Sequence, residues 1–389
     1  MSIITDIDKQ YVASTYARFP VELVSGKGSI VVDSAGKEYI DLGSGIAVTS
    51  FGIADDLWTG AVTAQLNKLQ HTSNLYYTEP CAVLAKMLCE RTGMKKVFFS
   101  NSGAEANECA IKVARKYVAG KKGADYHTII TLENSFHGRT LTTLAATGQD
   151  HYHELFQPLT PGFVHAPADD VENLQKLVAE HKIAAIMIEC IQGEGGVNVL
   201  SKEYVKAVAE ICQTEDIILI VDEVQTGNGR TGELYAYMNY GIKPDIVSTA
   251  KGLGGGLPLG ACVLGDKVEN VLDFGDHGST FGGNPVCCAG AVNILERIDD
   301  ALLDDVKKKS AYIFDSLKAC KGVKSITGIG LMIGIETEKP AAEIVKMCME
   351  KGVLCLTAKN KVRLLPALNI PLDLLAKAID VIKEACGCI

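Results

Sequence analysis

The sequence lacks several features that would assign it to a class of protein at once. Its 38 lysines and arginines are outnumbered by 47 acidic residues, for a net charge of −9. Proteins that bind nucleic acid through its phosphates need a basic surface, so this balance argues against such a partner. No apolar run approaches the length of a membrane span. The first ten residues, MSIITDIDKQ, have neither the basic nor the apolar region of a signal peptide. We therefore expect a cytoplasmic protein without a membrane partner.

Cysteine is plentiful, but its spacing lacks the pattern of a disulfide framework. Thirteen cysteines, an odd number, are scattered at irregular intervals. This pattern is typical of reduced thiols. Only Cys386 and Cys388 lie close together, and because no second pair accompanies them we expect a solvated tail. No grouping of histidine, cysteine and carboxylate has the spacing of a zinc site, so we predict no metal.

The chain also lacks linkers, charge blocks and low-complexity segments. Its 389 residues are too many for one ordinary core, and 47% apolar with 22% charged residues is a globular composition. We predict a large domain over residues 51–285. Residues 1–50, with a hairpin expected at Gly28–Leu42, and residues 286–389, with a helix followed by short strands, would form a smaller α+β domain. A TIM barrel is the competing architecture, but two dissimilar ends fit it poorly.

Short apolar runs alternate with helical patterns in the middle of the chain. Such runs are typical of strands buried on both faces, and their alternation with helices predicts a doubly wound, mostly parallel sheet of the α/β class. The runs are Val97–Phe99, Thr128–Leu132, Ile183–Ile191, Ile217–Val221, Ile246–Thr249 and Ala261–Leu264. The helical patterns begin at Ala106, Val171 and Lys202.

Polar or glycine-rich segments follow five of these runs. They are SNSGAEANE, ENSFHGRT, QGEGG, DEVQTGNGRTG and KGLGGG. Open α/β sheets bind ligands outside the carboxyl ends of their strands. Five such segments at one edge therefore predict a single binding site.

Three of the segments carry groups that one ligand could use together. Ser102, Gly103 and Ala104 start a helix, where exposed N–H groups and the helix dipole favour a phosphate, although a plain serine cap is the simpler interpretation. Asp222 ends a buried strand and needs a partner there, either an arginine such as Arg230 or a protonated ring nitrogen. The lysine of KGLGGG could pair with Asp222 or Glu223, or it could act as a nucleophilic amine.

A phosphate cradle, a buried acid and an amine together match pyridoxal phosphate. Its aldehyde suits Lys251, its pyridine nitrogen suits Asp222 and its phosphate suits the helix start. Phe136 could stack on the ring, although a core aromatic is equally consistent with the sequence, and we interpret His137 as structural rather than as a base. The Walker pattern GxxxxGK[ST] is absent and GxGxxG does not join a strand to a helix, so neither a P-loop enzyme nor an NAD-dependent dehydrogenase is favoured.

At these residues the sequence resembles the class III, or ornithine-type, aminotransferases, which have the fold type I architecture of pyridoxal-phosphate enzymes. The resemblance extends over nearly the whole chain, from about Tyr16 to beyond Arg363. It is carried by NSGAEANE, FHGRT, DEVQTGNGRTG, STAKGLGGG and HGSTFGGNP, with HTSNLYYTEP and GIAVTSFG in addition. It implies a large cofactor-binding domain and a smaller domain that both termini build.

The resemblance also implies roles in a cofactor site. Lys251 would bond the aldehyde carbon of the cofactor and move a proton to and from the reacting carbon of the substrate. Asp222 would keep the pyridine nitrogen protonated, and Gln225 would hydrogen-bond the phenolic oxygen. Phe136 would stack on the ring. The phosphate would be held by Ser102, Gly103, Ala104 and, in a homodimer with shared active sites, the partner subunit's Thr280.

Four further positions would bind substrate. Arg139 and Ser279 would contact the amino donor, and Arg363 would bind the α-carboxylate of glutamate or 2-oxoglutarate. Glu194 would pair with Arg363 when no such carboxylate is present. Two guanidinium forks suit a dicarboxylate, whereas a surface salt bridge is the usual role of an arginine.

The resemblance implies exchange of the δ-amino group between N-acetylornithine and 2-oxoglutarate in arginine biosynthesis. Gly45 favours this donor, because ornithine δ-aminotransferases tend to carry a tyrosine there. Related activities on ornithine, succinylornithine, succinyl-diaminopimelate or 4-aminobutyrate stay open as alternatives, as does a non-catalytic binding protein. Two departures from the family pattern, Phe51–Trp58 and Asn228, have no assigned role.

Overall fold

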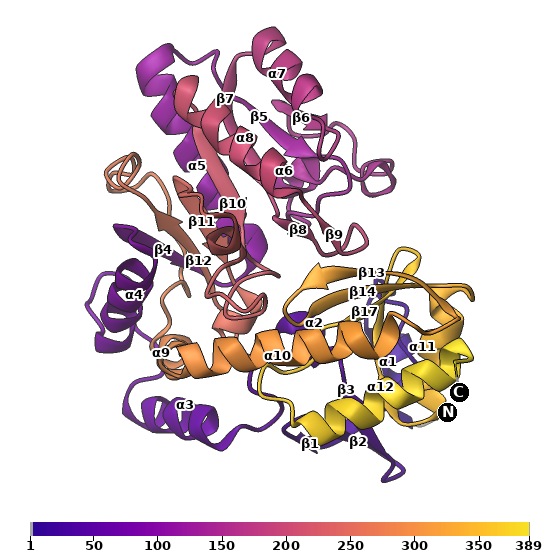
Figure 1. The fold of residues 1–389 in the computed structure, drawn as a ribbon. Helices are drawn as coiled ribbons and strands as arrows, with labels where there is room; N and C mark the ends of the chain where they lie inside the picture. Colours follow the sequence, from indigo (N-terminus) through magenta and orange to yellow (C-terminus); the bar gives the residue numbers. More distant parts are fainter. Residues whose placement is uncertain (1–2, 389) are drawn as a thin grey trace.

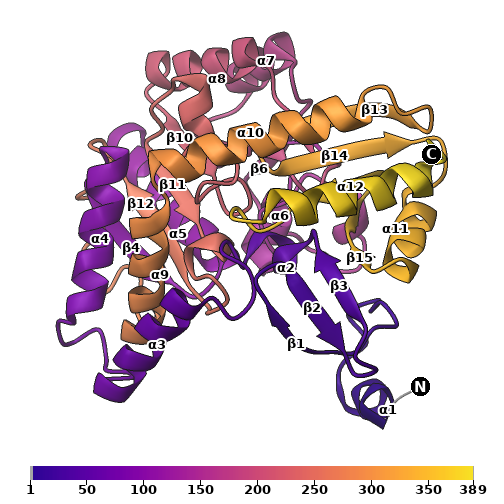
Figure 2. The ribbon, with the colours of Figure 1, turned by 60° about the horizontal axis from the view of Figure 1, so that its bottom comes forward.

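The computed structural model describes residues 3–388. It contains one seven-stranded sheet and, beside it, two four-stranded sheets that the two ends of the chain build (Figures 1 and 2). None of the helices in residues 3–388 combines the length and the apolar character needed to cross a membrane.

The seven-stranded sheet confirms the predicted doubly wound, mostly parallel α/β architecture. Its strand order is β4-β12-β11-β10-β7-β5-β6, and only β12 runs antiparallel to its neighbours. The strands are β4 (Lys96–Ser100), β5 (Thr128–Leu132), β6 (Phe163–Ala166), β7 (Ile183–Ile188), β10 (Ile218–Asp222), β11 (Ile246–Thr249) and β12 (Gly260–Leu264). Every predicted apolar run overlaps one of these strands.

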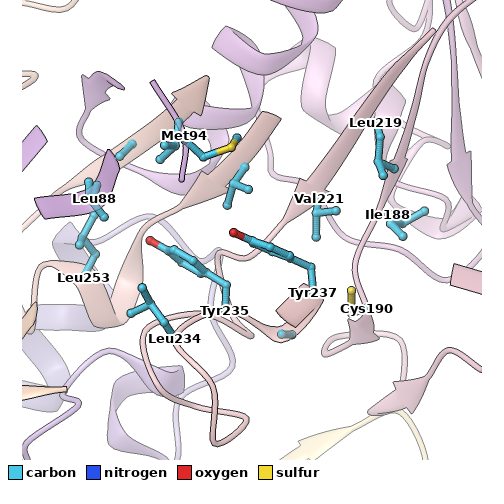
Figure 3. Packing of buried hydrophobic residues seen from close by; sticks show 14 of the residues in the cluster. Leu88, Met94, Ile188, Cys190, Leu219, Val221, Leu234, Tyr235, Tyr237 and Leu253 are labelled. Carbon is cyan, nitrogen blue, oxygen red and sulfur yellow. The ribbon is translucent and has the colours of Figure 1, made fainter. Parts of the chain in front are cut away.

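Helices cover both faces of this sheet, and β10 shows why. Ile218 and Ile220 pack in the same core as α5, whereas Leu219 and Val221 pack with α4, α7 and α8. Successive side chains of a strand point to opposite faces, so a strand between two helix layers must be apolar throughout. Figure 3 shows the second core, where Val221 lies near the stacked rings of Tyr235 and Tyr237. The helices are α4 (Glu79–Thr92), α5 (Gly103–Lys122), α7 (Val171–Glu180) and α8 (Lys202–Thr214).

The two ends of the chain are joined by hydrogen bonds. Strand β15 (Val353–Leu354) pairs in parallel with β3 (Glu38–Asp41), which closes the predicted hairpin with β2 (Ile30–Asp33). The second four-stranded sheet has the order β13-β14-β17-β16. Its strands are β13 (Val323–Ile329), β14 (Met332–Thr337), β16 (Leu356–Ala358) and β17 (Lys361–Leu364). This pairing supports a smaller domain from both termini, and the boundaries at residues 50 and 285 stay a prediction.

The remaining elements complete both parts of the molecule. The helices are α1 (Ile3–Tyr11), α2 (Ser44–Ala47), α3 (Asp56–Lys68), α6 (Leu141–Ala146), α9 (Pro285–Arg297), α10 (Asp300–Leu317), α11 (Ala341–Glu350) and α12 (Leu372–Cys386). Three 3-10 turns are η1 (Asp150–Tyr152), η2 (Ala236–Tyr240) and η3 (Lys251–Leu253), and the short strands are β1 (Leu23–Lys27), β8 (Ile191–Gln192) and β9 (Asn198–Val199).

The atypical segment Phe51–Trp58 attaches α3 to α9. The Asp55 side chain caps α3 by accepting the Trp58 N–H at 2.9 Å. It also accepts two hydrogen bonds from Arg297 at 2.6 and 2.9 Å. The Arg297 guanidinium lies 3.8 Å from the centroid of the Phe51 ring. A helix cap, a bidentate ion pair and a cation–π contact thus meet in this segment.

The cysteine prediction was wrong at the C-terminus. Cys320 and Cys388 form a disulfide, with Cα atoms 5.2 Å apart and a sequence separation of 68. Cys386 is buried at the end of α12 rather than solvated. The sequence argument compared only cysteines that are neighbours in the chain, whereas this bridge joins the segment after α10 to the segment after α12. The other eleven cysteines, all within residues 3–388, are free thiols.

Candidate functional site

The predicted segments meet at one edge of the large sheet around a cavity of about 460 Å³. Four of the five segments line it. The fifth, QGEGG, lies behind the wall, where Glu194 accepts a hydrogen bond from Gln225 at 3.1 Å. The sequence-predicted residues that line the cavity are Ser102, Gly103, Ala104, Phe136, Arg139, Asp222, Gln225 and Lys251.

The start of α5 forms one end of this cavity. Ser102 caps the helix: its hydroxyl accepts the Glu105 N–H at 3.2 Å and donates to the Glu105 carboxylate at 2.8 Å. The first N–H groups of a helix have no partner within it, and here they belong to residues that line the cavity. A Cβ atom at Gly103 would lie only 2.6 Å from Cγ1 of Val224, so glycine is required for this close approach. The serine cap is therefore confirmed, and the phosphate site stays a prediction.

Asp222 is held in place by three donors and is 4% exposed. Its Oδ2 accepts from Asn107 Nδ2 and lies 2.8 Å from His137 Nδ1, and its Oδ1 accepts the Val224 N–H. The arginine alternative was wrong, because Arg230 is buried elsewhere and donates to the carbonyls of Leu331 and Pro366. His137 contacts Asp222 and its Nε2 is buried without a partner among residues 3–388, and its structural role stays a prediction.

Lys251 follows β11 in an unusual backbone conformation, with φ +45°. Residues other than glycine rarely adopt this left-handed backbone region, and such strain is common at functional sites. Glu223, suggested as a partner, instead accepts hydrogen bonds from Thr226, Ala236 and Tyr237. Burial lowers the pKa of Lys251, although the charge of Glu194 opposes this effect. A lowered pKa favours the free amine, which is the nucleophilic form.

Glu189 is a cavity residue that the sequence argument missed. It is 5% exposed, and its carboxylate accepts the Phe136 N–H at 2.9 Å. Burial, together with the charge of Asp222, raises the pKa of Glu189 well above its ordinary value. The signal was present in the sequence, since Glu189 is a lone acid within the apolar run Ile183–Ile191. That run was interpreted as a strand only.

A buried ion pair lies behind Gln225. Arg363, on β17 and 3% exposed, donates through Nη1 to Glu194 at 2.6 Å, to the Gly193 carbonyl at 3.2 Å and to Gln225 Oε1 at 3.1 Å. Burial would raise the pKa of Glu194, but the charge and hydrogen bond of Arg363 outweigh it and lower that pKa. Nε of Arg363 is buried without a partner among the described residues. The arginine thus retains an unused donor.

Arg139 and the loop at residues 279–280 lie at the outer side. Arg139 is exposed at the cavity, with its guanidinium 4.5 Å from the ring centroid of Tyr152. Ser279 does not line the cavity within residues 3–388; its hydroxyl accepts from Asn101 Nδ2 and the Gly282 N–H. Thr280 is exposed and also lies outside the lining of this chain's cavity. The contact of Thr280 with a partner subunit stays a prediction.

The glycines after Lys251 mainly allow neighbouring segments of the chain to pack closely. Side chains at Gly252 and Gly255 would collide with Ser50 and Ile294, respectively. Of these glycines only Gly256 lines the cavity in the described part of the chain. Close packing, rather than access to the cavity, therefore accounts for most of the run.

Comparison with known proteins agrees with this architecture. The model of the family "Aminotransferase class-III" matches residues 11–386. An acetylornithine aminotransferase of Haemophilus ducreyi is 51% identical over 98% of both chains, and one of Methanocaldococcus jannaschii is 47% identical over 96% of both. The structure of ornithine aminotransferase from Toxoplasma gondii ME49 has a TM-score of 0.94 at 33% identity, covering 99% of this chain and 94% of that one. N-acetylornithine aminotransferase from Stenotrophomonas maltophilia K279a has a TM-score of 0.85 at 34% identity, with 98% of each chain covered. The chain belongs to the class III aminotransferases and has their fold type I architecture.

Proposed function

We propose that the protein transfers the δ-amino group between N-acetylornithine and 2-oxoglutarate. The observation that carries the proposal is the cavity itself, where an amine and a fixed acid converge, with one arginine at its rim and another behind its wall. Relatives at 51% and 47% identity, both acetylornithine aminotransferases, support the choice of donor.

As a class III aminotransferase, the protein uses pyridoxal phosphate, and its residues fit that cofactor. Asn107 and His137 fix the Asp222 carboxylate at the wall of the cavity, where it can accept a hydrogen bond from a ring nitrogen. Gly103 leaves the N-terminus of a 20-residue helix open toward a phosphate. When bound, the cofactor supplies an electron sink that acidifies the reacting carbon of the substrate.

Individual residues of the chain have separate roles in binding the cofactor and in moving protons. The Lys251 amine would hold the cofactor at its aldehyde carbon and would carry a proton to and from the reacting carbon of the substrate. Phe136, which lines the cavity and whose backbone N–H is held by Glu189, would stack on the ring. Gln225 lines the cavity, and its Nε2, which donates one hydrogen bond to Glu194, would donate a second to the phenolic oxygen. Ser102 and the first turn of α5 would hold the phosphate.

The two arginines explain how one site accepts both substrates. N-acetylornithine has one carboxylate, which Arg139 binds. Glu194 meanwhile neutralises Arg363 through the 2.6 Å ion pair. 2-Oxoglutarate has two carboxylates, so Arg363 exchanges Glu194 for the second one. An isolated buried guanidinium would be costly when the donor is bound, and Glu194 prevents this.

Ornithine is the second candidate donor, and a specific observation favours it. The ornithine aminotransferase structure matches this fold with a TM-score of 0.94. Ornithine differs from N-acetylornithine in its free α-amino group. Gly45, where ornithine δ-aminotransferases tend to carry a tyrosine, favours the acetylated donor, although it lines a different cavity of this chain.

A panel of ω-amines tests the choice. Purified holoenzyme is offered N-acetylornithine, ornithine, succinylornithine, succinyl-diaminopimelate and 4-aminobutyrate with 2-oxoglutarate, and kcat/KM is compared. We expect N-acetylornithine to have the highest value. A higher value for ornithine or 4-aminobutyrate would replace the proposed donor. Lys251→Ala should abolish transfer with every amine.

We also propose a homodimer with shared active sites. Several large apolar side chains are exposed on the segments around residues 57–83 and 274–281, and an apolar surface of this extent marks an interface. They are Leu57, Leu66, Leu69, Leu75, Tyr76, Tyr77, Val83, Phe274 and Phe281. Thr280 lies among them and would reach the phosphate site of the other subunit.

Mixed dimers test the shared site. The Lys251→Ala homodimer should be inactive, and the Thr280→Ala homodimer should have low activity. A mixed dimer holds one doubly altered site and one intact site, so mixing the two variants should restore activity. Sedimentation velocity measures the dimer itself. No recovery after subunit exchange in a mixture shown to contain mixed dimers would contradict sharing.

A further inference from the structure

Arg139 has an environment that the proposed function leaves unexplained. Its side chain is exposed, and an exposed arginine ordinarily samples many rotamers. Among residues 3–388, the contacts that define its guanidinium are with two aromatic rings. Its central carbon lies 4.5 Å from the ring centroid of Tyr152 and 5.7 Å from that of Phe136. An arginine that stacks on a ring keeps its edge N–H groups free for a carboxylate.

Tyr152 is itself firmly placed. It ends the 3-10 turn η1, and its N–H donates to the Gln149 carbonyl at 3.1 Å. The residues on either side anchor that turn. Gln149 is buried and donates through Nε2 to the Ser135 carbonyl at 2.9 Å. His153 is buried, with Nε2 2.9 Å from the Leu144 carbonyl. The backbone that carries the Tyr152 ring is thus held in place by the buried residues on either side of the turn.

The same ring also contacts the predicted cofactor-stacking residue. The rings of Tyr152 and Phe136 have centroids 5.8 Å apart and an interplanar angle of 68°, an edge-to-face pair. The Phe136 N–H is held by Glu189 at 2.9 Å. One tyrosine therefore links the residue that stacks on the cofactor to the arginine at the mouth of the cavity.

We propose that Tyr152 is a positioning residue that holds the Arg139 guanidinium for the carboxylate of the substrate. The proposal deepens the function proposed above and rests on it, since it takes Arg139 as the carboxylate-binding residue. Its recognition chemistry is a planar cation with one face on an aromatic ring and one edge toward a carboxylate. The tyrosine hydroxyl is not required, so phenylalanine should serve equally well.

The test compares Tyr152→Leu with Tyr152→Phe in the holoenzyme. For Tyr152→Leu we expect the KM for N-acetylornithine and the Kd of glutarate, an unreactive dicarboxylate, to rise roughly three- to tenfold, as for loss of one cation–π contact. We expect kcat to stay close to the wild-type value. Tyr152→Phe should restore both constants. Calorimetric binding of glutarate gives a readout that does not depend on turnover.

A donor without a carboxylate separates positioning from a structural role. With 1,4-diaminobutane as donor, Tyr152→Leu and wild type should have equal kcat/KM. Tyr117→Leu is a matched control, because Tyr117 on α5 carries Lys121 4.5 Å above its ring away from the cavity, and it should leave glutarate affinity unchanged. In an Arg139→Ala background, Tyr152→Leu should add no further loss.

Two results would overturn the proposal: unchanged glutarate affinity in Tyr152→Leu, or an equal loss with 1,4-diaminobutane. If Tyr152→Leu fails to fold, Arg139→Lys replaces it, since lysine keeps the charge but not the planar stacking, and unchanged glutarate affinity in that variant would equally overturn the proposal. If the wild type ignores N-acetylornithine yet binds glutarate more tightly than Tyr152→Leu, only the proposed donor fails.

Discussion

At the scale of single residues, the left-handed backbone at Lys251 requires support from its surroundings. Asn228 provides it. The side chain is 2% exposed, and its Nδ2 donates to Thr249 Oγ1 at 3.0 Å and to the Ala250 carbonyl at 3.3 Å. These are the two residues before the lysine. Asn228 itself has φ +58°, which asparagine tolerates better than other non-glycine residues. Its departure from the family pattern thus acquires a structural role.

Replacing the Asn228 amide should destabilise the turn that contains Lys251. We expect Asn228→Leu to lower the free energy of unfolding by about 1–3 kcal/mol, since it removes two buried hydrogen bonds and places a bulky residue at positive φ. The variant should also release cofactor faster. Asn228→Gly keeps the backbone conformation without the amide, and we expect an intermediate effect. Denaturant unfolding and cofactor absorbance measure both. Wild-type stability in Asn228→Leu would contradict this role.

The lowered pKa of Lys251 predicts a pH dependence. Burial favours the neutral amine, so the amine form is already populated below the ordinary lysine pKa of 10.5. The rate at which apoenzyme captures pyridoxal phosphate should therefore rise with pH and level off below that value. Glu194 is the acid that most strongly opposes this shift. Glu194→Gln should move the midpoint to lower pH, as stopped-flow absorbance would show. A shift to higher pH would exclude this electrostatic account.

At the scale of elements, the site forms because parallel strands end at one edge of the sheet. Asp222 ends β10, and Lys251 follows β11, which pairs with β10 in parallel. Gly103 starts α5 immediately after β4. Antiparallel β12 lies between β4 and β11, so those two strands still run in the same direction. Groups from distant parts of the sequence therefore meet at this edge of the sheet, and no local sequence pattern predicts which of them are in contact.

The close approach between α5 and the strand-end loop after β10 gives an element-scale prediction. A methyl group at Gly103 would collide with Val224, which lies between Asp222 and Gln225 in sequence. We expect Gly103→Ala to weaken cofactor binding about tenfold, a loss of about 1.4 kcal/mol. Gly120→Ala in the same helix is the control, because nothing lies within 4 Å of its added methyl group. That variant should be neutral or stabilising by about 0.5–1 kcal/mol. Equilibrium titration with pyridoxal phosphate measures both variants, and equal affinities would contradict the packing argument.

Local patterns predicted the strands and the segments that line the site, but they could not predict contacts. Every apolar run became a strand because burial on both faces needs uninterrupted apolar residues. Strand β6 was missed because His165 interrupts the run FVHA. No sequence pattern pointed to Tyr152, because the role proposed for it depends on Arg139, thirteen positions earlier, lying over its ring. The partner of Asp222 was equally hidden, because Asn107 comes from the interior of a helix.

At the scale of the whole molecule, Arg363 connects the smaller sheet to the site. It lies on β17, and its Nη1 bonds to Glu194, Gln225 and the Gly193 carbonyl, all from segments that follow strands of the large sheet. Other contacts cross at the same place, since Thr327 on β13 donates to the Val197 carbonyl at 2.8 Å and Lys359 contacts Asn134. The Arg363–Glu194 ion pair, which we propose distinguishes the two substrates, therefore also connects the smaller sheet to the segments around the large one.

This arrangement predicts that the two half-reactions respond differently to the loss of the ion pair. Arg363→Gln alone would leave Glu194 half-buried without its cation, whereas the double variant Arg363→Gln with Glu194→Gln removes both charges. In the double variant we expect the half-reaction with N-acetylornithine to stay within about threefold of wild type, because Arg139 binds its carboxylate. The half-reaction with 2-oxoglutarate should slow about 10- to 100-fold, the effect of losing a charge-assisted hydrogen-bonding pair. Single-turnover absorbance follows each half-reaction separately. Equal slowing of both would show that Arg363 acts as a structural joint alone, since only a residue that binds the second carboxylate can tell the two substrates apart.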